Sequence, residues 1–424
     1  MMSVNSADSW PPAGVRGVNL DTIVAIVRRR PEVTRADLIE ASGLSKATVA
    51  GIVTELLGRG LLRESGKRSA GRGRSQVLLT FNSAARMVLG AQVEDERCTV
   101  VLADMDGAAQ EVVSRPLAGP APEAILDALT DAATEVRGRT TAPILGLGVG
   151  VPGDVDKAGR KVVVAVSHGW KDLDIADQLE QRVHLPVVAA NRAKVAALGH
   201  LRGRGPDADD NLIYIFLGRG IVAGIVIDGQ LYFGRDGAAG DIGHVTVHRD
   251  GMLCGCGNQG CLHTVASEGA ILGLARAAAR RAGAAAPLQA LTHGRLTELN
   301  LAVLADAARR QDPDVVRLLA DVGADIGIVV ANLVNTLSPD AVVLGGPTIA
   351  LGEALLDPIR QEIRRRALPE PLAGLRITES LDDGATGAAG AAALCIGRLP
   401  TVLRSLPIGN GRRPGPVLVG AGGA

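Results

Sequence analysis

The stretch GAAGDIGHVTVHRDGMLCGCGNQGCLHT, residues 237–264, holds three of the five cysteines in a chain of 424 residues. Cys254, Cys256 and Cys261 lie close together and follow His244. One imidazole and three thiolates suit a tetrahedral Zn²⁺, and four protein ligands leave no open position on the metal. The pattern therefore predicts a structural zinc site. His248 is a competing ligand, and a group of free cysteines is the alternative to a metal.

Composition indicates a soluble globular protein. Hydrophobic residues make up 47% of the sequence, and its length suffices for about two or three domains. The sequence has no uninterrupted apolar run of membrane-spanning length, and its N-terminus lacks the basic-then-apolar order of a secretory signal. We therefore expect a cytoplasmic protein without membrane contact. Aromatic residues, at 2%, argue against a stacking platform for single-stranded nucleic acid.

The first part of the chain is basic and has helical periodicity. Residues 1–82 contain 12 Lys and Arg against 7 Asp and Glu, whereas the remainder contains 33 against 38. NLDTIVAIVRRR, TRADLIEAS and SKATVAGIVTELLGRG predict three short helices, with caps at Thr34 and Ser45, a turn at Gly43 and a stop at Gly60. LLRESGKRSAGRGRSQVLLTF predicts a β-hairpin around a basic loop. Together they have the layout of a winged helix-turn-helix.

The third helix and the hairpin supply the candidate DNA contacts. Small and polar side chains on the outward helix face would let the helix enter a major groove. Gly51 costs a helix interior roughly 1 kcal/mol relative to Ala, and close approach to DNA would be a reason to keep it. The alternative is a helix that packs on another helix through this face. For the basic hairpin, the alternative to phosphate or minor-groove contacts is a solvated loop. The candidates are Ser45, Lys46, Thr48, Gly51, Arg63, Lys67, Arg68, Arg72 and Arg74.

From Met87 onward the sequence alternates between strands and helices. MVLGAQVEDERCTVVLADMDG predicts two adjacent strands, ILGLGVGVPGDVD a buried strand that enters a Gly-Pro turn, and NLIYIFLGRGIVAGIVIDGQL a hairpin. DAVVLGGPTIAL predicts a strand, a Gly-Gly turn and a helix. This βαβ alternation implies sheets covered by helices, in an α/β fold.

Several of these motifs resemble one protein family. GAAGDIGHVTV followed by CGCGNQGCLHT is similar to the signature of the ROK family, named for repressor, open reading frame and kinase. The resemblance continues through HGWKDLDIADQLEQRVHLPVVAANRAKVAALGH and VVLGGP. It implies a two-lobed, actin-like ATPase domain, ROK sugar kinase-like, over residues 83–400, with a sugar bound between the lobes. A winged helix-turn-helix, here residues 16–82, is what the repressor branch adds; we expect residues 1–15 and 401–424 to be disordered.

Departures from the family's kinases favour a regulator. The kinases carry an Asn-Asp pair whose Asp is the base for the sugar hydroxyl, and here the pair is Asn191-Arg192. A guanidinium cannot accept that proton. The first phosphate loop matches AQVEDERCT, without a glycine, and the second matches GRGIVAG, in which Arg219 and Val222 intrude. Close approach of a phosphate needs bare backbone, so we expect no catalytic residue and no ATP-dependent phosphorylation.

The resemblance implies a partly retained sugar site made of Asn191, Arg192, Asp241, His244 and His263. Asp241 and His263 each replace a Glu of the family, and ordinary loop polarity is the alternative for both. His244 would link the metal to the sugar. Arg192 is expected to begin a helix, where the dipole disfavours a cation, so we predict that it receives an anionic group such as a sugar phosphate. A locally paired or solvent-facing Arg192 is the alternative.

These features predict a sugar-responsive, DNA-binding transcriptional regulator, a repressor, whose kinase-like domain is inactive. The expected partners are a double-stranded DNA operator and a sugar or sugar phosphate. A two-fold operator needs two recognition helices, so we also expect a homodimer or a higher homo-oligomer. The first alternative is an active sugar kinase that carries a DNA-binding head. The second is a regulator controlled by a phosphotransfer protein instead of a sugar.

Overall fold

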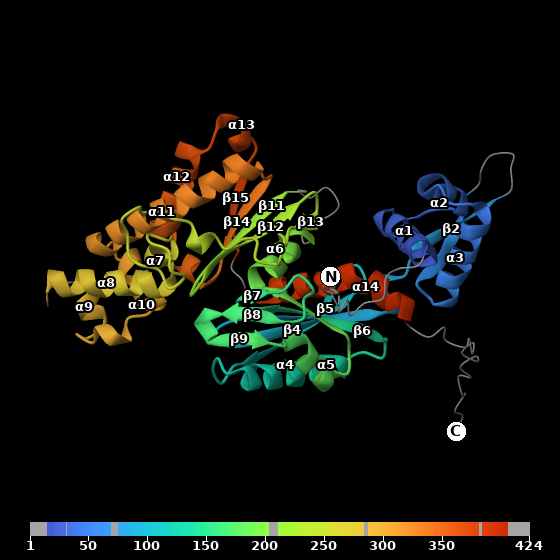
Figure 1. The fold of residues 1–424 in the computed structure, drawn as a ribbon, viewed down its shortest axis with the longest axis horizontal. Helices are drawn as coiled ribbons and strands as arrows, with labels where there is room; N and C mark the ends of the chain where they lie inside the picture. The colour runs from blue at the N-terminus through green and yellow to red at the C-terminus, as the bar shows by residue number, and fades with distance from the viewer. Residues whose placement is uncertain are drawn as a thin grey trace, which may run out of the picture. The chain divides into compact units, whose positions relative to one another are not determined.

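The computed structural model describes residues 15–30, 32–68, 75–202, 211–283, 287–380 and 384–405 (Figure 1). The chain separates into two compact units. Among the described residues, unit 1 contains those up to Met87, the turn Asp104–Asp106 and those from Gly397 onward; unit 2 contains residues 88–103 and 107–396. The segments expected to be disordered lie largely outside the described residues, although helices reach Val15 at one end and Ser405 at the other.

Unit 1 contains the three predicted helices and the hairpin: α1 (Val15–Arg29), α2 (Arg35–Ser42), α3 (Lys46–Gly58), β1 (Leu62–Arg68) and β2 (Gln76–Phe81). The predicted caps are confirmed. Thr34 and Asp37 form a reciprocal capping box at the start of α2, and the Ser45 hydroxyl accepts the Thr48 amide at the start of α3. Gly43 closes α2 with a φ of 66°, a conformation that glycine adopts without strain. α3 ends two residues before the predicted stop at Gly60.

One five-stranded sheet of unit 2 has the order β10-β6-β3-β4-β5. Its strands are β3 (Met87–Val93), β4 (Arg97–Asp104), β5 (Ala109–Pro116), β6 (Ile144–Val151) and β10 (Val187–Asn191). α4 (Pro122–Arg137) and α5 (Ile175–Val183) cover one face and α14 (Ala385–Ser405) the other (Figure 1). A Cβ at Gly90 or Gly148 would lie 2.0 or 1.9 Å from a carbonyl oxygen of α14, so glycine permits this close packing.

The other five-stranded sheet has the order β13-β12-β11-β14-β15. Its strands are β11 (Leu212–Leu217), β12 (Ile221–Ile227), β13 (Gln230–Leu231), β14 (Ala341–Gly345) and β15 (Arg376–Ser380). One face packs on a core that includes α8 (Glu268–Ala282), α10 (Leu301–Arg309), α11 (Pro313–Leu337) and α12 (Glu353–Arg366). The other packs on α6 (Arg192–Arg202), which also contacts β6. α6 therefore lies at the junction of the two lobes.

Shorter elements complete unit 2. A small sheet contains β7 (Asp154–Val155), β8 (Val162–Ala165) and β9 (Trp170–Leu173). The short helices are α7 (His263–Ala266), α9 (Pro287–Leu291) and α13 (Pro369–Leu372), and 3₁₀ turns cover Val166–His168, Ile242–His244, Leu296–Glu298 and Pro347–Leu351; another, Ser83–Ala85, lies in unit 1. After the Gly-Gly turn the chain thus forms a 3₁₀ turn before α12, where the sequence predicts a helix directly.

Helix α11 has the length and composition of a membrane span, and half of its most apolar window is buried inside the structure. Ile326, Val330 and Val334 of this helix belong to the core beneath the second sheet. A buried core helix has the same composition as a membrane span, so the pattern alone is weak evidence for a membrane.

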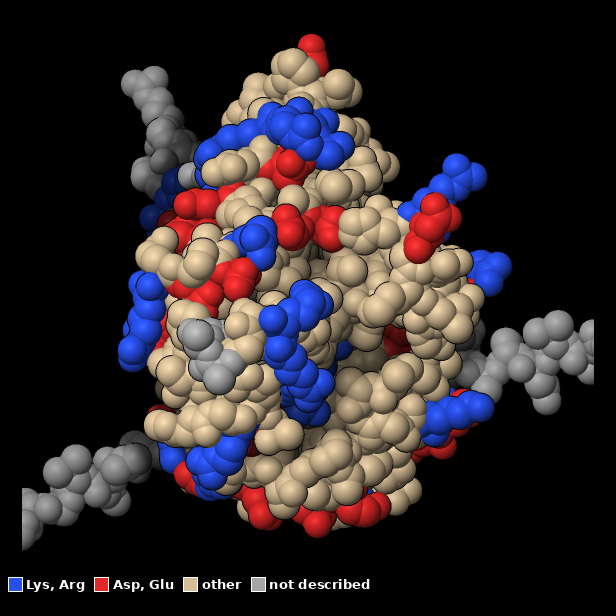
Figure 2. All heavy atoms as spheres, turned by 90° about the vertical axis from the view of Figure 1, so that its left-hand side faces the viewer, with Lys and Arg blue, Asp and Glu red and all other residues tan. Residues whose placement is uncertain are grey.

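On the face seen in Figure 2, basic and acidic side chains are interspersed, in keeping with the nearly balanced charge beyond residue 82.

Candidate functional site

The outward face of α3 presents the residues predicted to contact DNA. Ser45, Lys46 and Gly51 are exposed, whereas Thr48 is half-buried with its hydroxyl 2.9 Å from that of Ser45. No described atom lies within 4 Å of the position that a Cβ on Gly51 would take. The small-residue face therefore packs on no other described helix of this chain. It remains open for a partner that approaches closely.

The predicted hairpin is confirmed. β1 and β2 pair antiparallel from Leu62 opposite Phe81 to Arg68 opposite Gln76. Arg63, Lys67 and Arg68 are exposed on β1, and a guanidinium nitrogen of Arg68 lies 3.5 Å from a carboxylate oxygen of Asp37. Arg72 and Arg74, the other two predicted DNA contacts of this stretch, lie outside the described residues.

The four predicted metal ligands come together. One ligand atom from each of His244, Cys254, Cys256 and Cys261 lies within 4.8 Å of the others. Cys254 Sγ is 3.6 Å from His244 Nδ1, and Cys256 Sγ is 3.7 Å from Cys261 Sγ. The competing ligand His248 instead lies 2.8 Å from Asp325 of α11. This group could hold a metal ion, with His244 as its imidazole.

Backbone contacts shape the loop that carries these ligands. The Cys254 amide donates to the Asn258 carbonyl over 2.7 Å, and Thr246 and Cys261 form a β-bridge. Gly260 has a φ of 71°, and a Cβ there would lie 1.6 Å from the His248 carbonyl oxygen. Only glycine fits at this position. The loop thus folds back on itself and brings Cys261 beside His244.

Near the metal group, a buried polar cluster joins Asp154, Asp241 and Lys194. The two carboxyl groups are hydrogen-bonded, and burial together with the charge of Asp241 raises the pKa of Asp154 to about 6. Burial also raises the pKa of Asp241. Lys194 is 2% exposed, and its ammonium group donates to the Gly237 carbonyl over 2.6 Å. Burial lowers the pKa of Lys194, although the two nearby carboxyl groups act in the opposite direction. Carboxyl and ammonium groups arranged in this way can bind the hydroxyls of a polyol.

Sequence reasoning identified Asp241 in this cluster and missed Asp154 and Lys194. Asp154 directly follows Pro152 and Gly153 at the end of β6, which is where a strand presents side chains to a ligand crevice. Lys194 stands two residues after Arg192 in the first turn of α6. The nearby signals in the sequence are the turn after β6 for Asp154 and the Asn191-Arg192 pair for Lys194.

The predicted sugar contacts Asn191 and His263 are engaged with the protein itself. Asn191 is 3% exposed; its Nδ2 donates to the Gly153 carbonyl and its Oδ1 accepts the Ala193 amide, each over 2.8 Å. His263 Nε2 donates to the Arg219 carbonyl over 3.2 Å, and burial lowers the pKa of this imidazole. The rings of His263 and His244 are stacked with centroids 5.9 Å apart. In the structure, Asn191 thus positions the first turn of α6.

Arg192 begins α6, as predicted, and is 6% exposed. Its Nη1 lies 3.2 Å from Asp95 Oδ1, and its guanidinium carbon lies 4.0 Å from the centre of the Phe216 ring. Asp95 also forms an ion pair with Arg219 at 3.6 Å, and His168 Nε2 lies 3.8 Å from its carboxylate. Arg192 is therefore locally paired, which was the alternative to an anion site. The Asp95 cluster, meaning Asp95 with Arg192, Arg219 and His168, escaped sequence reasoning because its members are far apart in the chain.

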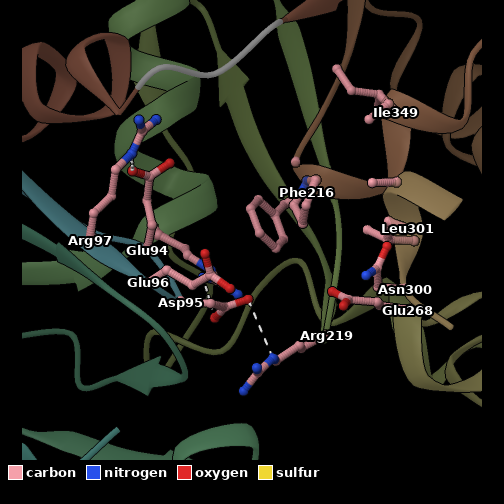
Figure 3. A pocket seen from close by; sticks show the side chains of 15 residues that line it. Glu94, Asp95, Glu96, Arg97, Phe216, Arg219, Glu268, Asn300, Leu301 and Ile349 are labelled. Atoms are coloured by element: carbon pink, nitrogen blue, oxygen red, sulfur yellow. Dashed lines mark hydrogen bonds and ion pairs between the residues drawn. The ribbon is translucent and has the colours of Figure 1, made fainter. Parts of the chain in front are cut away.

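A cavity of about 840 Å³ adjoins the Asp95 cluster. Glu94, Asp95, Glu96 and Arg97 form one side, and Glu268, Asn300, Leu301 and Ile349 line the other (Figure 3). Glu94 pairs with Arg97, and Arg219 extends toward Asp95. Burial and the nearby Asp95 raise the pKa of Glu268. The charged side chains that line this cavity are thus both acidic and basic, and Glu94 and Asp95 are paired with arginines.

Known proteins similar to this chain share both its sequence pattern and its fold. The ROK family pattern matches residues 90–398. A putative xylose repressor of Caldicellulosiruptor sp. (strain Rt8B.4) is 30% identical over 359 residues, which cover 83% of this chain and 89% of the repressor. The crystal structure of a ROK family transcriptional regulator, a homologue of the E. coli MLC protein, has a TM-score of 0.75 at 24% identity, over 92% of this chain and 98% of that one.

A kinase is also among the similar structures. The ROK family glucokinase of Streptomyces griseus, in complex with glucose and AMPPNP, has a TM-score of 0.63 at 32% identity, over 73% of this chain and 98% of that one. The predicted α/β fold, a winged helix-turn-helix followed by a two-lobed actin-like ATPase domain, is confirmed by these likenesses. The chain belongs to the ROK family, in its transcriptional-regulator branch.

Proposed function

We propose that this protein is a sugar-responsive transcriptional repressor whose kinase-like unit binds a sugar without phosphorylating it. The observation that carries the proposal is the helix-turn-helix with a basic hairpin, joined in one chain to a ROK domain. The similarity to a putative xylose repressor extends over 83% of the chain, whereas the glucokinase likeness covers 73%. A regulator needs both units, and a kinase needs only the second.

Side chains at the former phosphate loops support an inactive kinase-like unit. The turn between β3 and β4 carries Glu94, Asp95 and Glu96, and Arg219 stands in the turn between β11 and β12. These side chains stand in turns where the family's kinases carry glycine, and a phosphate can approach a backbone closely only where the backbone is bare. Arg192, at the position of the base, is paired with Asp95, and a guanidinium has no acceptor for the proton of a sugar hydroxyl.

We infer a structural Zn²⁺ at His244, Cys254, Cys256 and Cys261. Tetrahedral Zn²⁺ has Zn–S distances of about 2.3 Å and Zn–N distances of about 2.0–2.1 Å, which separate two sulfurs by about 3.8 Å and a sulfur from a nitrogen by about 3.6 Å. The observed separations of 3.7 and 3.6 Å match these values. Four protein ligands would complete the coordination, so the ion would order the loop and take no part in a reaction.

The sugar would bind at Asp154, Lys194, Asp241 and His244, with His263 beside them and Asn191 and Arg192 in support. Lys194 faces two carboxyl groups and Arg192 is paired with Asp95, so these two cations are already balanced. A phosphate would have to displace one of these pairings. An uncharged sugar therefore suits the cluster better than a sugar phosphate.

The operator would be double-stranded DNA, read by the α3 residues Ser45, Lys46, Thr48 and Gly51, with phosphate contacts from Arg63, Lys67, Arg68, Arg72 and Arg74. The protein would act in the cytoplasm. We propose a homodimer or higher oligomer, because a two-fold operator needs two recognition helices about one helical turn apart.

The test combines operator binding with sugar titration. Promoter fragments are screened by fluorescence anisotropy with the full chain, and the bound fragment is then titrated with a panel of sugars and their phosphate esters. We expect one uncharged sugar to change operator affinity. A chain that binds none of the fragments above its affinity for random DNA contradicts the proposal.

A sugar kinase with a DNA-binding head is the second candidate, favoured by the likeness to a glucokinase. ATP consumption is measured with the same sugar panel, with an authentic ROK glucokinase as the positive control. We expect no turnover above the rate without sugar. Sugar-dependent ATP consumption would establish kinase activity. It would exclude the proposal that the kinase-like unit binds a sugar without phosphorylating it.

A further inference from the structure

We propose that strand β4 couples the sugar cleft to the DNA-binding unit, with the Asp95 cluster at its beginning and the turn Asp104–Asp106 at its end. This inference rests on the proposed function, because it assigns the element through which sugar binding changes operator affinity. Contacts at the two ends of β4 connect it to the sugar cleft and to the DNA-binding unit.

At the beginning of β4, one carboxylate joins both lobes of unit 2. Asp95 lies in the turn before the strand and contacts Arg192 of α6 at 3.2 Å and Arg219 of the β11–β12 turn at 3.6 Å. Lys194, in the same first turn of α6, faces Asp154 and Asp241. A sugar that binds these carboxyl groups pulls on the first turn of α6. Arg192 transmits that movement to Asp95, because both side chains are largely buried and their ion pair is costly to break.

At its other end, β4 leads into a turn that belongs to unit 1. The turn Asp104–Asp106 groups with the winged helix-turn-helix, although β4 up to Ala103 groups with unit 2. Met105 is 2% exposed, and its carbonyl accepts a 2.7 Å hydrogen bond from Arg28 of α1. Its amide donates to the Ser83 carbonyl over 3.1 Å. Arg28 also covers the Phe81 ring at 5.5 Å, so the side chain of α1 that holds this turn contacts the hairpin as well.

Between these ends β4 is stiff. It lies between β3 and β5, and six of its eight residues are buried. At about 3.3 Å per residue it spans roughly 26 Å. A strand paired on both edges cannot shorten, bend or slide without breaking ladder hydrogen bonds, so β4 moves together with its sheet, and a displacement of Asp95 that shifts the sheet reaches Met105. Coupling through a packed element of this kind requires direct measurement of both binding equilibria.

The experiment measures the coupling factor, defined as the ratio of operator Kd with and without saturating sugar. Arg219→Gln breaks an exposed link of the cluster, and Arg28→Gln breaks the link to the turn. Glu96→Gln, in the same turn as Asp95, and Arg30→Gln, just after α1, are the matched controls. Wild-type coupling is expected within the usual range of about 5- to 150-fold. We expect Arg28→Gln to bring the factor within about twofold of one, Arg219→Gln to reduce it at least threefold, and the controls to retain it.

Each variant is also measured for operator affinity without sugar and for sugar affinity without operator, after its thermal unfolding has been compared with wild type. Reciprocity requires that operator change sugar affinity by the same factor. If Arg28→Gln and Arg219→Gln keep the wild-type factor, β4 is not the coupling element and the proposed function stands. If wild-type operator binding ignores every sugar, the proposed function itself fails.

Discussion

Replacing Asp154 by Asn should raise the free energy of unfolding at neutral pH and leave it unchanged in acid. Burial and Asp241 raise the pKa of Asp154 from its ordinary value of 3.8 to about 6. Between these two pH values Asp154 is protonated in the folded protein and ionised in the unfolded chain. The free energy of unfolding therefore falls as pH rises from 3.8 to 6, and the full loss is reached above pH 6. Asn carries no charge, and its amide can donate to the ionised Asp241.

The magnitude follows from the shift of about two pH units. At 1.36 kcal/mol per unit the full effect is about 3 kcal/mol. Asp154 is only partly buried, so water screens part of the repulsion and we expect a gain of about 1–2 kcal/mol at pH 7.5. The gain should decline through pH 6 and vanish below pH 4.

The assay is urea unfolding at pH 3.8, 5, 6 and 7.5. Unfolding is monitored by the fluorescence of Trp170, which is buried in unit 2, and all variants carry Trp10→Phe so that Trp170 is the single tryptophan. Asp131→Asn, an exposed change of equal charge on α4, is the control and should alter stability by less than about 0.5 kcal/mol at every pH. A gain for Asp154→Asn that is the same at all four pH values, or a loss at pH 7.5, would refute the account of the carboxyl pair.

Three further predictions concern the metal and the DNA contacts. Cys256→Ser should abolish metal binding, measured by elemental analysis of the purified protein. His248→Gln should still bind the metal, because His248 pairs with Asp325. Metal retained by Cys256→Ser would contradict the proposed ligand set. Gly51→Ala should raise the free energy of unfolding by up to about 1 kcal/mol, since no described atom obstructs the Cβ, and weaken operator binding at least threefold; unchanged binding would remove Gly51 from the interface. Lys46→Ala with Arg63→Ala should reduce the slope of log K against log salt by up to about 0.9 per lost phosphate contact, and an unchanged slope would show that neither residue contacts phosphate.

The features that could be predicted from the sequence depend on neighbours in the chain. The Thr34–Asp37 capping box and the Ser45 cap follow from residues three apart, where helix geometry alone sets the contact. The metal group lies within 18 residues, from His244 to Cys261, and glycines let that short loop close. The family signature lies in the same stretch. For these features, spacing along the chain was sufficient information.

The tertiary structure decided what those residues contact. The sequence predicted an anion-binding Arg192, but the fold places Asp95, 97 residues earlier, beside it, and Phe216 beneath it. Asp154, Lys194 and Asp241 meet because β6, α6 and the loop before the metal group converge at the junction of the lobes. Such contacts depend on sheet order and helix packing, which local periodicity does not encode. The chain alone thus determined the helices of unit 1, the His244 and cysteine group and the family, and the packing of the two lobes determined which charges are paired.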